Sequence, residues 1–315
     1  MKNKKFLSLQ YLRAVSILGV VYAHISYSVI GILSVDILFV LSGFIILFII
    51  DKKKYTFKKF LFSRIFRILP FYYIVMSLVL ILGYAHEPNS KNIILSFLFI
   101  NPEIPILEPG WTLQYEMFFY IVCAVSLIFI KEIKSIYFIL SLILLGFGIF
   151  FNYFWYLEKA YNHLLEFWMG MSIFFIIRKD LFKKINKIYI ISILLLAFLF
   201  SIYYSYVLLS LEDGRIPYRF IVYGIPAFLI VLCSLLYEKY NELKEYKILL
   251  LVGNASFSIY MSHMIIIYLY SAYIDSGSSD FKNMVIILLS VLVGFFIYLY
   301  IEKPYINFYK VRWVK

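Results

Sequence analysis

Residues 33–50 read LSVDILFVLSGFIILFII, a run of 18 residues in which Asp36 is the only charged side chain. An α-helix of this length rises about 27 Å, close to the ~30 Å hydrocarbon core of a bilayer. Polar residues do not recur along the run, so a helix formed by it has no polar face that a soluble fold could turn toward water. It therefore predicts a membrane-spanning helix with one carboxylate just inside its start.

Comparable apolar runs recur along the chain of 315 residues, of which 63% are hydrophobic and 15% charged. A soluble domain keeps roughly a quarter of its residues charged. We predict ten spans with a helical period, near residues 9–29, 33–50, 66–85, 113–130, 135–154, 162–177, 188–208, 217–237, 253–273 and 281–302. The predicted fold is an all-α integral membrane protein with about ten transmembrane helices in one bundle. Residues 1–315 form a single transmembrane domain in this prediction, with no appended soluble domain.

The net charge of +12 follows the predicted topology. Loops on the side of the two termini contain 24 lysines and arginines, whereas the opposite loops contain five. Cytoplasmic loops carry the positive excess in membrane proteins, so we expect both termini in the cytoplasm. The basic residues therefore indicate orientation in a lipid bilayer, and no nucleic-acid partner is expected.

Ionisable residues inside a span are functional candidates by default, because burying them in lipid is costly. The first span contains Arg13 and His24, 11 residues apart. Eleven steps of about 100° return to nearly the same helix face, about 16 Å further along the axis. The alternative is an arginine that extends to the cytoplasmic surface and a buried, hydrogen-bonded histidine.

Two carboxylates lie in the same outer half of the predicted bundle as His24. A tight turn around Gly31 would bring Asp36 to the depth of His24, and a carboxylate beside an imidazole suits a general base. Asp36 could instead cap the second helix. Glu116 begins the span 113–130, where a capping role is again the alternative.

Arg64 and Arg67 lie at the entrance of the third predicted span, directly before Ile68, at a spacing of three that places both on one helix face. Paired guanidinium groups at a membrane mouth suit a phosphate-rich ligand. Anionic lipid headgroups would satisfy them equally well.

Three further polar residues lie within predicted spans. His263, in the ninth span, could join the His24 group or bond a neighbouring helix. His163 and Glu166 open the sixth span and are weaker candidates. The four histidines lack the spacing of a zinc site, so we expect no metal.

Five segments resemble signatures of the membrane-bound acyltransferase-3 family, in which O-acetyltransferases of bacterial surface polysaccharides are prominent. They are Leu12-Arg13-Ala14 through to His24, Val35 to Phe44, Arg64-Ile65-Phe66-Arg67 before Ile68-Leu69-Pro70, Trp111 to Glu116, and Ser258 to His263. The resemblance covers essentially the whole chain in order.

The resemblance implies transfer of an acyl group, usually acetyl from acetyl-CoA, to a hydroxyl of a glycan. The acceptor would be an O-antigen, capsule or exopolysaccharide, free or lipid-linked, and the enzyme would reside in the bacterial inner membrane. Carried over by position, His24 is similar to the catalytic base, Asp36 to its supporting carboxylate, and Glu116 to a recurrent family glutamate.

The donor side follows from the same resemblance. Arg13, Arg64 and Arg67 are similar to residues that bind acetyl-CoA. Trp111, Ser258 and His263 fall in the two later signatures and are possible supporting residues.

A carrier or flippase for a glycan, lipid or small anion is the alternative function, because charged residues within spans also mark transport pathways. The inverted repeat typical of many carriers is not visible in the sequence. Transport would be favoured if coenzyme A did not bind and if substitution of Arg64 and Arg67 had no effect.

Overall fold

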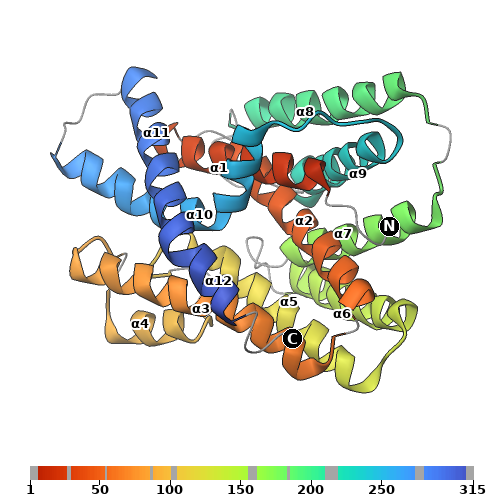
Figure 1. Cartoon of the computed structure of the whole chain (residues 1–315), viewed down its shortest axis with the longest axis horizontal. Coiled ribbons are helices and arrows are strands. Elements are labelled where there is room, and N and C mark those ends of the chain that lie inside the picture. Colours follow the sequence, from red (N-terminus) through yellow and green to blue (C-terminus); the bar gives the residue numbers. More distant parts are fainter. Residues whose placement is uncertain are drawn as a thin grey trace. The chain divides into compact units, whose positions relative to one another are not determined.

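The computed structural model describes residues 6–26, 30–53, 55–85, 88–100, 105–154, 162–182, 185–209, 219–273 and 280–309. Every regular element within these ranges is a helix (Figure 1). Seven of the described helices are long and apolar enough to cross a membrane. The predicted all-α membrane fold is thus confirmed, whereas the count of ten spans and the side of the termini stay predictions.

The helices follow one another along the whole described chain. They are α1 (Leu7–Ser26), α2 (Ile30–Lys53), α3 (Phe57–Ile81), α4 (Ser90–Phe97), α5 (Gly110–Phe129), α6 (Ile133–Phe154), α7 (Asn162–Lys179), α8 (Lys187–Leu209), the π-helix η1 (Phe220–Gly224), α9 (Ile225–Tyr240), α10 (Lys247–Tyr273), α11 (Asp280–Ile297), the π-helix η2 (Tyr298–Glu302) and α12 (Lys303–Tyr309). Each predicted span falls on one of them. The third was placed too late, because α3 begins at Phe57 and so contains both Arg64 and Arg67.

The chain forms two compact units. Unit 1 consists of Met1–Ala23, Ser28–Lys54 and Ile130–Gly253, and unit 2 of His24–Tyr27, Tyr55–Phe129 and Asn254–Lys315. Both units are assembled from segments that alternate along the sequence. The expectation of a single domain stays a prediction.

In unit 1, α2 packs along α7 at a backbone distance that only glycine permits (Figure 1). A Cβ atom added at Gly43 would lie 2.1 Å from the carbonyl oxygen of Phe167. One added at Gly170 would lie 2.0 Å from the carbonyl oxygen of Val40. Small residues allow such close packing between membrane helices. The Ser42-Gly43-Phe44 segment in the middle of the 33–50 stretch is therefore a helix-packing element.

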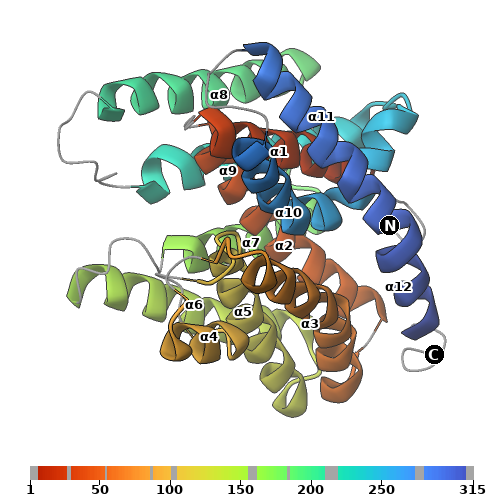
Figure 2. The same ribbon diagram turned by 90° about the vertical axis from the view of Figure 1, so that its left-hand side faces the viewer.

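In unit 2, α3 packs against α5 (Figure 2) and also holds α4. The hydroxyl of Tyr72 donates to the carbonyl of Ser96 (3.2 Å), and that of Tyr73 donates to the carbonyl of Phe97 (3.0 Å). The segment between α3 and α5 thus contains a short helix, α4, that is fastened to α3 by two tyrosines.

Candidate active site

His24 lies near the C-terminal end of α1, in the part of this helix that belongs to unit 2. Its Nδ1 atom is 3.8 Å from Oε1 of Glu108, which precedes α5. The His24 side chain is 26% exposed and that of Glu108 is 50% exposed, so the pair is open to a ligand. Tyr268 donates its hydroxyl to the second oxygen of Glu108 at 3.4 Å. The sequence analysis did not single out Glu108, which has no motif of its own.

His263, on α10, lies next to His24. The ring centroids are 5.1 Å apart and the planes are tilted by 51°. His263 is fully buried, and its Nδ1 atom is 2.7 Å from the carbonyl oxygen of Tyr260. Of the two alternatives for His263, the structure places its ring beside that of His24 in unit 2, and a functional role for it stays a prediction.

Tyr260 fastens α10 to the beginning of α5. Its hydroxyl lies 2.8 Å from Oγ1 of Thr112 and 3.2 Å from the carbonyl oxygen of Pro109, and its one hydrogen can be donated to either. The Thr112 hydroxyl donates to the same Pro109 carbonyl at 3.0 Å. These bonds fix the turn that carries Glu108, so α10 determines the positions of both His263 and the carboxylate beside His24.

Three polar side chains lie along one face of α5, which leads away from this turn. Thr112, Glu116 and Tyr120 are spaced by four residues and cover about 12 Å of helix axis. The hydroxyl of Tyr120 donates to Oε2 of Glu116 at 3.2 Å. The guanidinium of Arg64 lies 5.8 Å from the Tyr120 ring centroid. A polar line on α5 therefore leads from the neighbourhood of Tyr260 to Arg64.

Arg64 is a buried cation in α3. Its guanidinium also lies 5.6 Å from the Phe60 ring centroid, and its Nε atom has no hydrogen-bond partner among the described residues. Arg67 follows one turn later and is partly exposed. Within the described part of the chain, neither arginine forms an ion pair with a carboxylate. A buried cation of this kind favours an anionic ligand.

Arg13 lies on the part of α1 that belongs to unit 1. The N-terminus of this helix is held by Glu238 of α9, whose carboxylate accepts hydrogen bonds from the backbone amides of Leu7 and Ser8, both at 2.9 Å. Ser8 adds its hydroxyl at 2.5 Å. Sequence reasoning missed Glu238, because its partners lie about 230 positions away.

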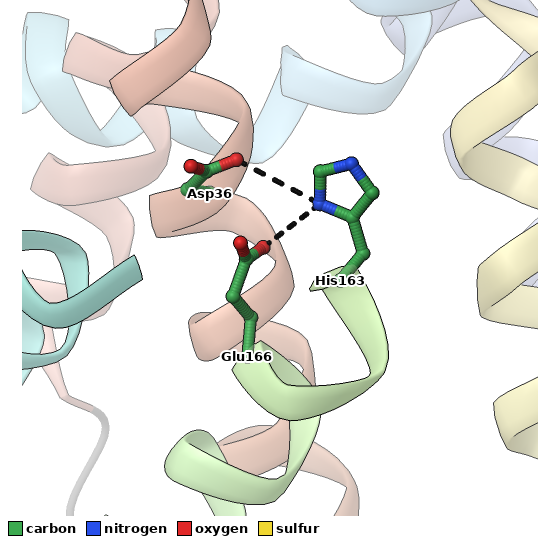
Figure 3. Close-up of side chains that lie close together, drawn as sticks. All are labelled: Asp36, His163 and Glu166. Atoms are coloured by element: carbon green, nitrogen blue, oxygen red, sulfur yellow. Dashed lines mark hydrogen bonds and ion pairs between the residues drawn. The ribbon is translucent and has the colours of Figure 1, made fainter. Parts of the chain in front are cut away.

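Asp36 lies in unit 1 at the centre of a buried ionic cluster (Figure 3). Its Oδ1 atom is 2.6 Å from Nη2 of Arg219 and 3.7 Å from Nδ1 of His163. The same Nδ1 is 3.0 Å from Oε2 of Glu166. The imidazole of His163 stacks on Phe39 with a centroid distance of 4.6 Å. Asp36 is thus surrounded by His163 and Glu166, which were weaker candidates in the sequence, and by Arg219, which was not a candidate.

Asp36, His163 and Glu166 offer ligand atoms that all lie within 4.8 Å of one another. Two carboxylates and an imidazole are donors that a zinc or manganese ion accepts. Arg219 already occupies the Asp36 oxygen that faces His163. With both carboxylates ionised and His163 neutral, the cluster lacks one positive charge, which a single proton supplies. A bound cation could supply the same charge, because Asp36 Oδ2 and Glu166 Oε1 have no hydrogen-bond partner among the described residues. The expectation of no metal stays a prediction.

His24 and Asp36 fall in different units, each with its own partners. The support of His24 by Asp36 stays a prediction, and Glu108 is a second candidate for that role. Of the possible supporting residues, Trp111 packs edge-on against Tyr115, and Ser258 donates to the buried carboxylate of Glu302 at 2.5 Å.

The class of protein follows from the family models, because residues 6–303 match a model described as an acyltransferase domain. The matching model is that of the acyltransferase-3 family, and the chain belongs to this family. The match confirms the resemblance of the sequence motifs.

A bacterial protein resembles part of the chain. The chain is similar to the exopolysaccharide production protein ExoZ of Rhizobium meliloti (strain 1021), with 38% identity over 110 residues. This alignment covers 31% of the chain and 35% of the relative, so the chain spans about a third of that protein's length in the match. No solved structure matches the chain.

Proposed function

We propose that this acyltransferase moves an acetyl group from cytoplasmic acetyl-CoA to a hydroxyl of a cell-surface glycan, in the inner membrane of a bacterium. The acceptor is an O-antigen, capsule or exopolysaccharide, free or lipid-linked. The family supports acyl transfer, and the name of the Rhizobium relative supports a polysaccharide as the acceptor.

The observation that carries this proposal is the His24 group of unit 2. An imidazole that is partly exposed, beside a carboxylate, can take up a proton and have the resulting charge stabilised. Glu108 supplies that carboxylate at 3.8 Å. Acyl transfer to a hydroxyl requires such a base, because the neutral hydroxyl is a weak nucleophile.

The reaction proceeds with proton balance at His24. The imidazole accepts the proton of the acceptor hydroxyl while the oxygen of that hydroxyl bonds to the thioester carbonyl carbon. The carbon–sulfur bond then breaks, and the coenzyme A thiolate takes the proton back from the His24 imidazolium. The products are an O-acetyl ester and coenzyme A, and His24 is regenerated. An acetylated intermediate on the protein is the variant of this scheme.

The donor side is proposed from the arginines. Arg64 and Arg67 hold the phosphates of acetyl-CoA, because a buried guanidinium without a carboxylate partner in the described chain matches a phosphate. Arg13 is proposed to bind acetyl-CoA together with these two arginines. Glu116 and Tyr120 lie between Arg64 and the Thr112–Tyr260 contact, and we assign Glu116 to the same reaction centre.

Asp36 is proposed as a carboxylate that supports His24, as the family resemblance implies. Its buried ion pair with Arg219 gives it a fixed position in α2. A carrier or flippase is the second candidate function, and this intramembrane charge cluster is the observation that favours it.

The test uses membranes that contain the protein, acetyl-CoA labelled in the acetyl group, and the host's extracellular polysaccharide. We expect the label to enter the polysaccharide as an alkali-labile ester while free thiol appears in equal amount. Absence of both label and thiol release, with the protein folded, would contradict the proposal. Protein-dependent movement of polysaccharide across sealed vesicles in that case would establish the carrier instead.

A further inference from the structure

The hydrogen bond at Nδ1 fixes the tautomer of His263. The partner of Nδ1 is the backbone carbonyl of Tyr260, at 2.7 Å. A carbonyl oxygen can only accept, so Nδ1 must carry the hydrogen. In the neutral ring, the other nitrogen, Nε2, is then an acceptor with a free lone pair.

Nε2 of His263 has no hydrogen-bond partner among the described residues, although the ring is fully buried. Buried polar atoms are paired in the great majority of cases, and an exception calls for a specific explanation. The position of this atom supplies one, because the His263 ring lies 5.1 Å from the ring of the proposed base, His24. A bound substrate at His24 is the expected source of a donor.

The two imidazoles differ in the charge they can carry. His24 lies beside the carboxylate of Glu108. Within the described ranges, no carboxylate forms an ion pair with His263. An isolated buried cation is costly, so His24 takes up the reaction proton and His263 stays neutral. His263 therefore serves as a hydrogen-bond acceptor for a group that keeps its hydrogen.

That group cannot be the hydroxyl that reacts, since its one hydrogen goes to His24. We propose that Nε2 of His263 accepts a hydrogen bond from a second hydroxyl of the acceptor, next to the one that is acylated. This inference rests on the proposed function and names the acceptor class: a sugar unit with two adjacent hydroxyls. His263 is thereby a specificity-determining residue.

The His24 ring, 5.1 Å from that of His263, belongs to a side chain that is 26% exposed, whereas His263 is enclosed. The proposal therefore requires the His24 ring to move as the acceptor binds. Catalytic hydrogen bonds commonly tighten or form only in the substrate complex.

The test is a titration of the host's extracellular polysaccharide, de-O-acylated with alkali, against membranes with labelled acetyl-CoA. His263→Phe keeps the ring size and removes the acceptor nitrogen. We expect the apparent KM for polysaccharide to rise roughly tenfold to a hundredfold, the range for a lost buried hydrogen bond, with the KM for acetyl-CoA unchanged. His263→Gln, whose amide oxygen can accept near the Nε2 position, should recover much of the loss.

Three outcomes would overturn the inference. One is an unchanged KM for polysaccharide in His263→Phe, while the wild type transfers label. Another is a fall in kcat that no polysaccharide concentration restores, which would place His263 in the chemical step. The third is a raised KM for acetyl-CoA, which would place it against the donor. If the wild type itself transfers no label, the proposed function fails, and this inference fails with it.

Discussion

Nη2 of Arg219 lies 2.6 Å from Oδ1 of Asp36, an ion pair between a 16% exposed guanidinium and a fully buried carboxylate 183 positions apart in the sequence. Removal of one partner leaves the other as an uncompensated buried charge, which costs about 3–5 kcal/mol. We therefore expect Arg219→Ala to lower the thermal unfolding midpoint of the detergent-purified protein strongly. Arg219→Ala combined with Asp36→Asn should recover part of the loss, because neither charge then remains alone.

The matched control is the ion pair between Arg178 and Asp51, also within unit 1. Its atoms are 2.7 Å apart, but the two side chains are 46% and 33% exposed. Exposed pairs contribute about 0–1 kcal/mol, so Arg178→Ala should shift the midpoint little. Equal shifts for the two alanine variants would contradict the assignment of a buried cluster.

A second prediction about stability follows from the close contact between α2 and α7. Gly43→Ala places a methyl group 2.1 Å from a backbone oxygen, and such overpacking costs about 1–3 kcal/mol. Gly146→Ala is the control, because a Cβ at this helical position has no neighbour within 4 Å. We expect a lower unfolding midpoint for Gly43→Ala and an unchanged or higher one for Gly146→Ala. Tolerance of alanine at Gly43 would mean that the two helices do not approach this closely.

If Arg64 binds the phosphates of acetyl-CoA, its substitution should affect only donors that contain those phosphates. Arg64→Lys removes the planar fork that matches a phosphate, and we expect the KM for acetyl-CoA to rise about tenfold. S-acetyl-N-acetylcysteamine, which contains the thioester without phosphates, should be used equally well by the variant and the wild type. Lys58→Ala, on the exposed start of the same helix, should leave both donors unaffected. A loss with both donors would place Arg64 outside phosphate binding.

The two carboxylates proposed to support His24 can be separated by neutral substitutions of equal size. Glu108→Gln removes the charge 3.8 Å from Nδ1 of His24. We expect it to lower kcat, since the imidazolium loses its stabilising charge. Asp36→Asn should lower the unfolding midpoint through Arg219 and lower kcat as well. Normal kcat in Asp36→Asn at a temperature where it is folded would leave Glu108 as the supporting carboxylate.

The apolar runs were sufficient to predict the helices, because a span must satisfy its backbone internally and face lipid. They also pointed to the ionisable residues within the spans, among them His24, Asp36 and His263. The start of α3 was missed, because its first turns are basic and amphipathic. A basic helix end and a basic loop have the same composition here.

The partners of these residues could not be predicted in the same way. Glu108 precedes α5 in a loop, and only the bonds of Tyr260 to Pro109 and Thr112 fix that loop. Arg219, one of the five basic residues counted in the opposite loops, directly precedes η1. Tertiary packing, rather than any local pattern, brings these residues to an imidazole or a carboxylate.

The central claim is that His24 acts as the base of acyl transfer and that His163, in the cluster with Asp36 and Glu166, does not. The most direct measurement compares His24→Gln with His163→Gln in membranes matched for folded protein, by the rate at which labelled acetyl enters polysaccharide. We expect at least a hundredfold loss in His24→Gln, the contribution of a general base being about 10²–10⁴-fold, whereas His163→Gln keeps measurable transfer. Near-normal transfer in His24→Gln would contradict the account.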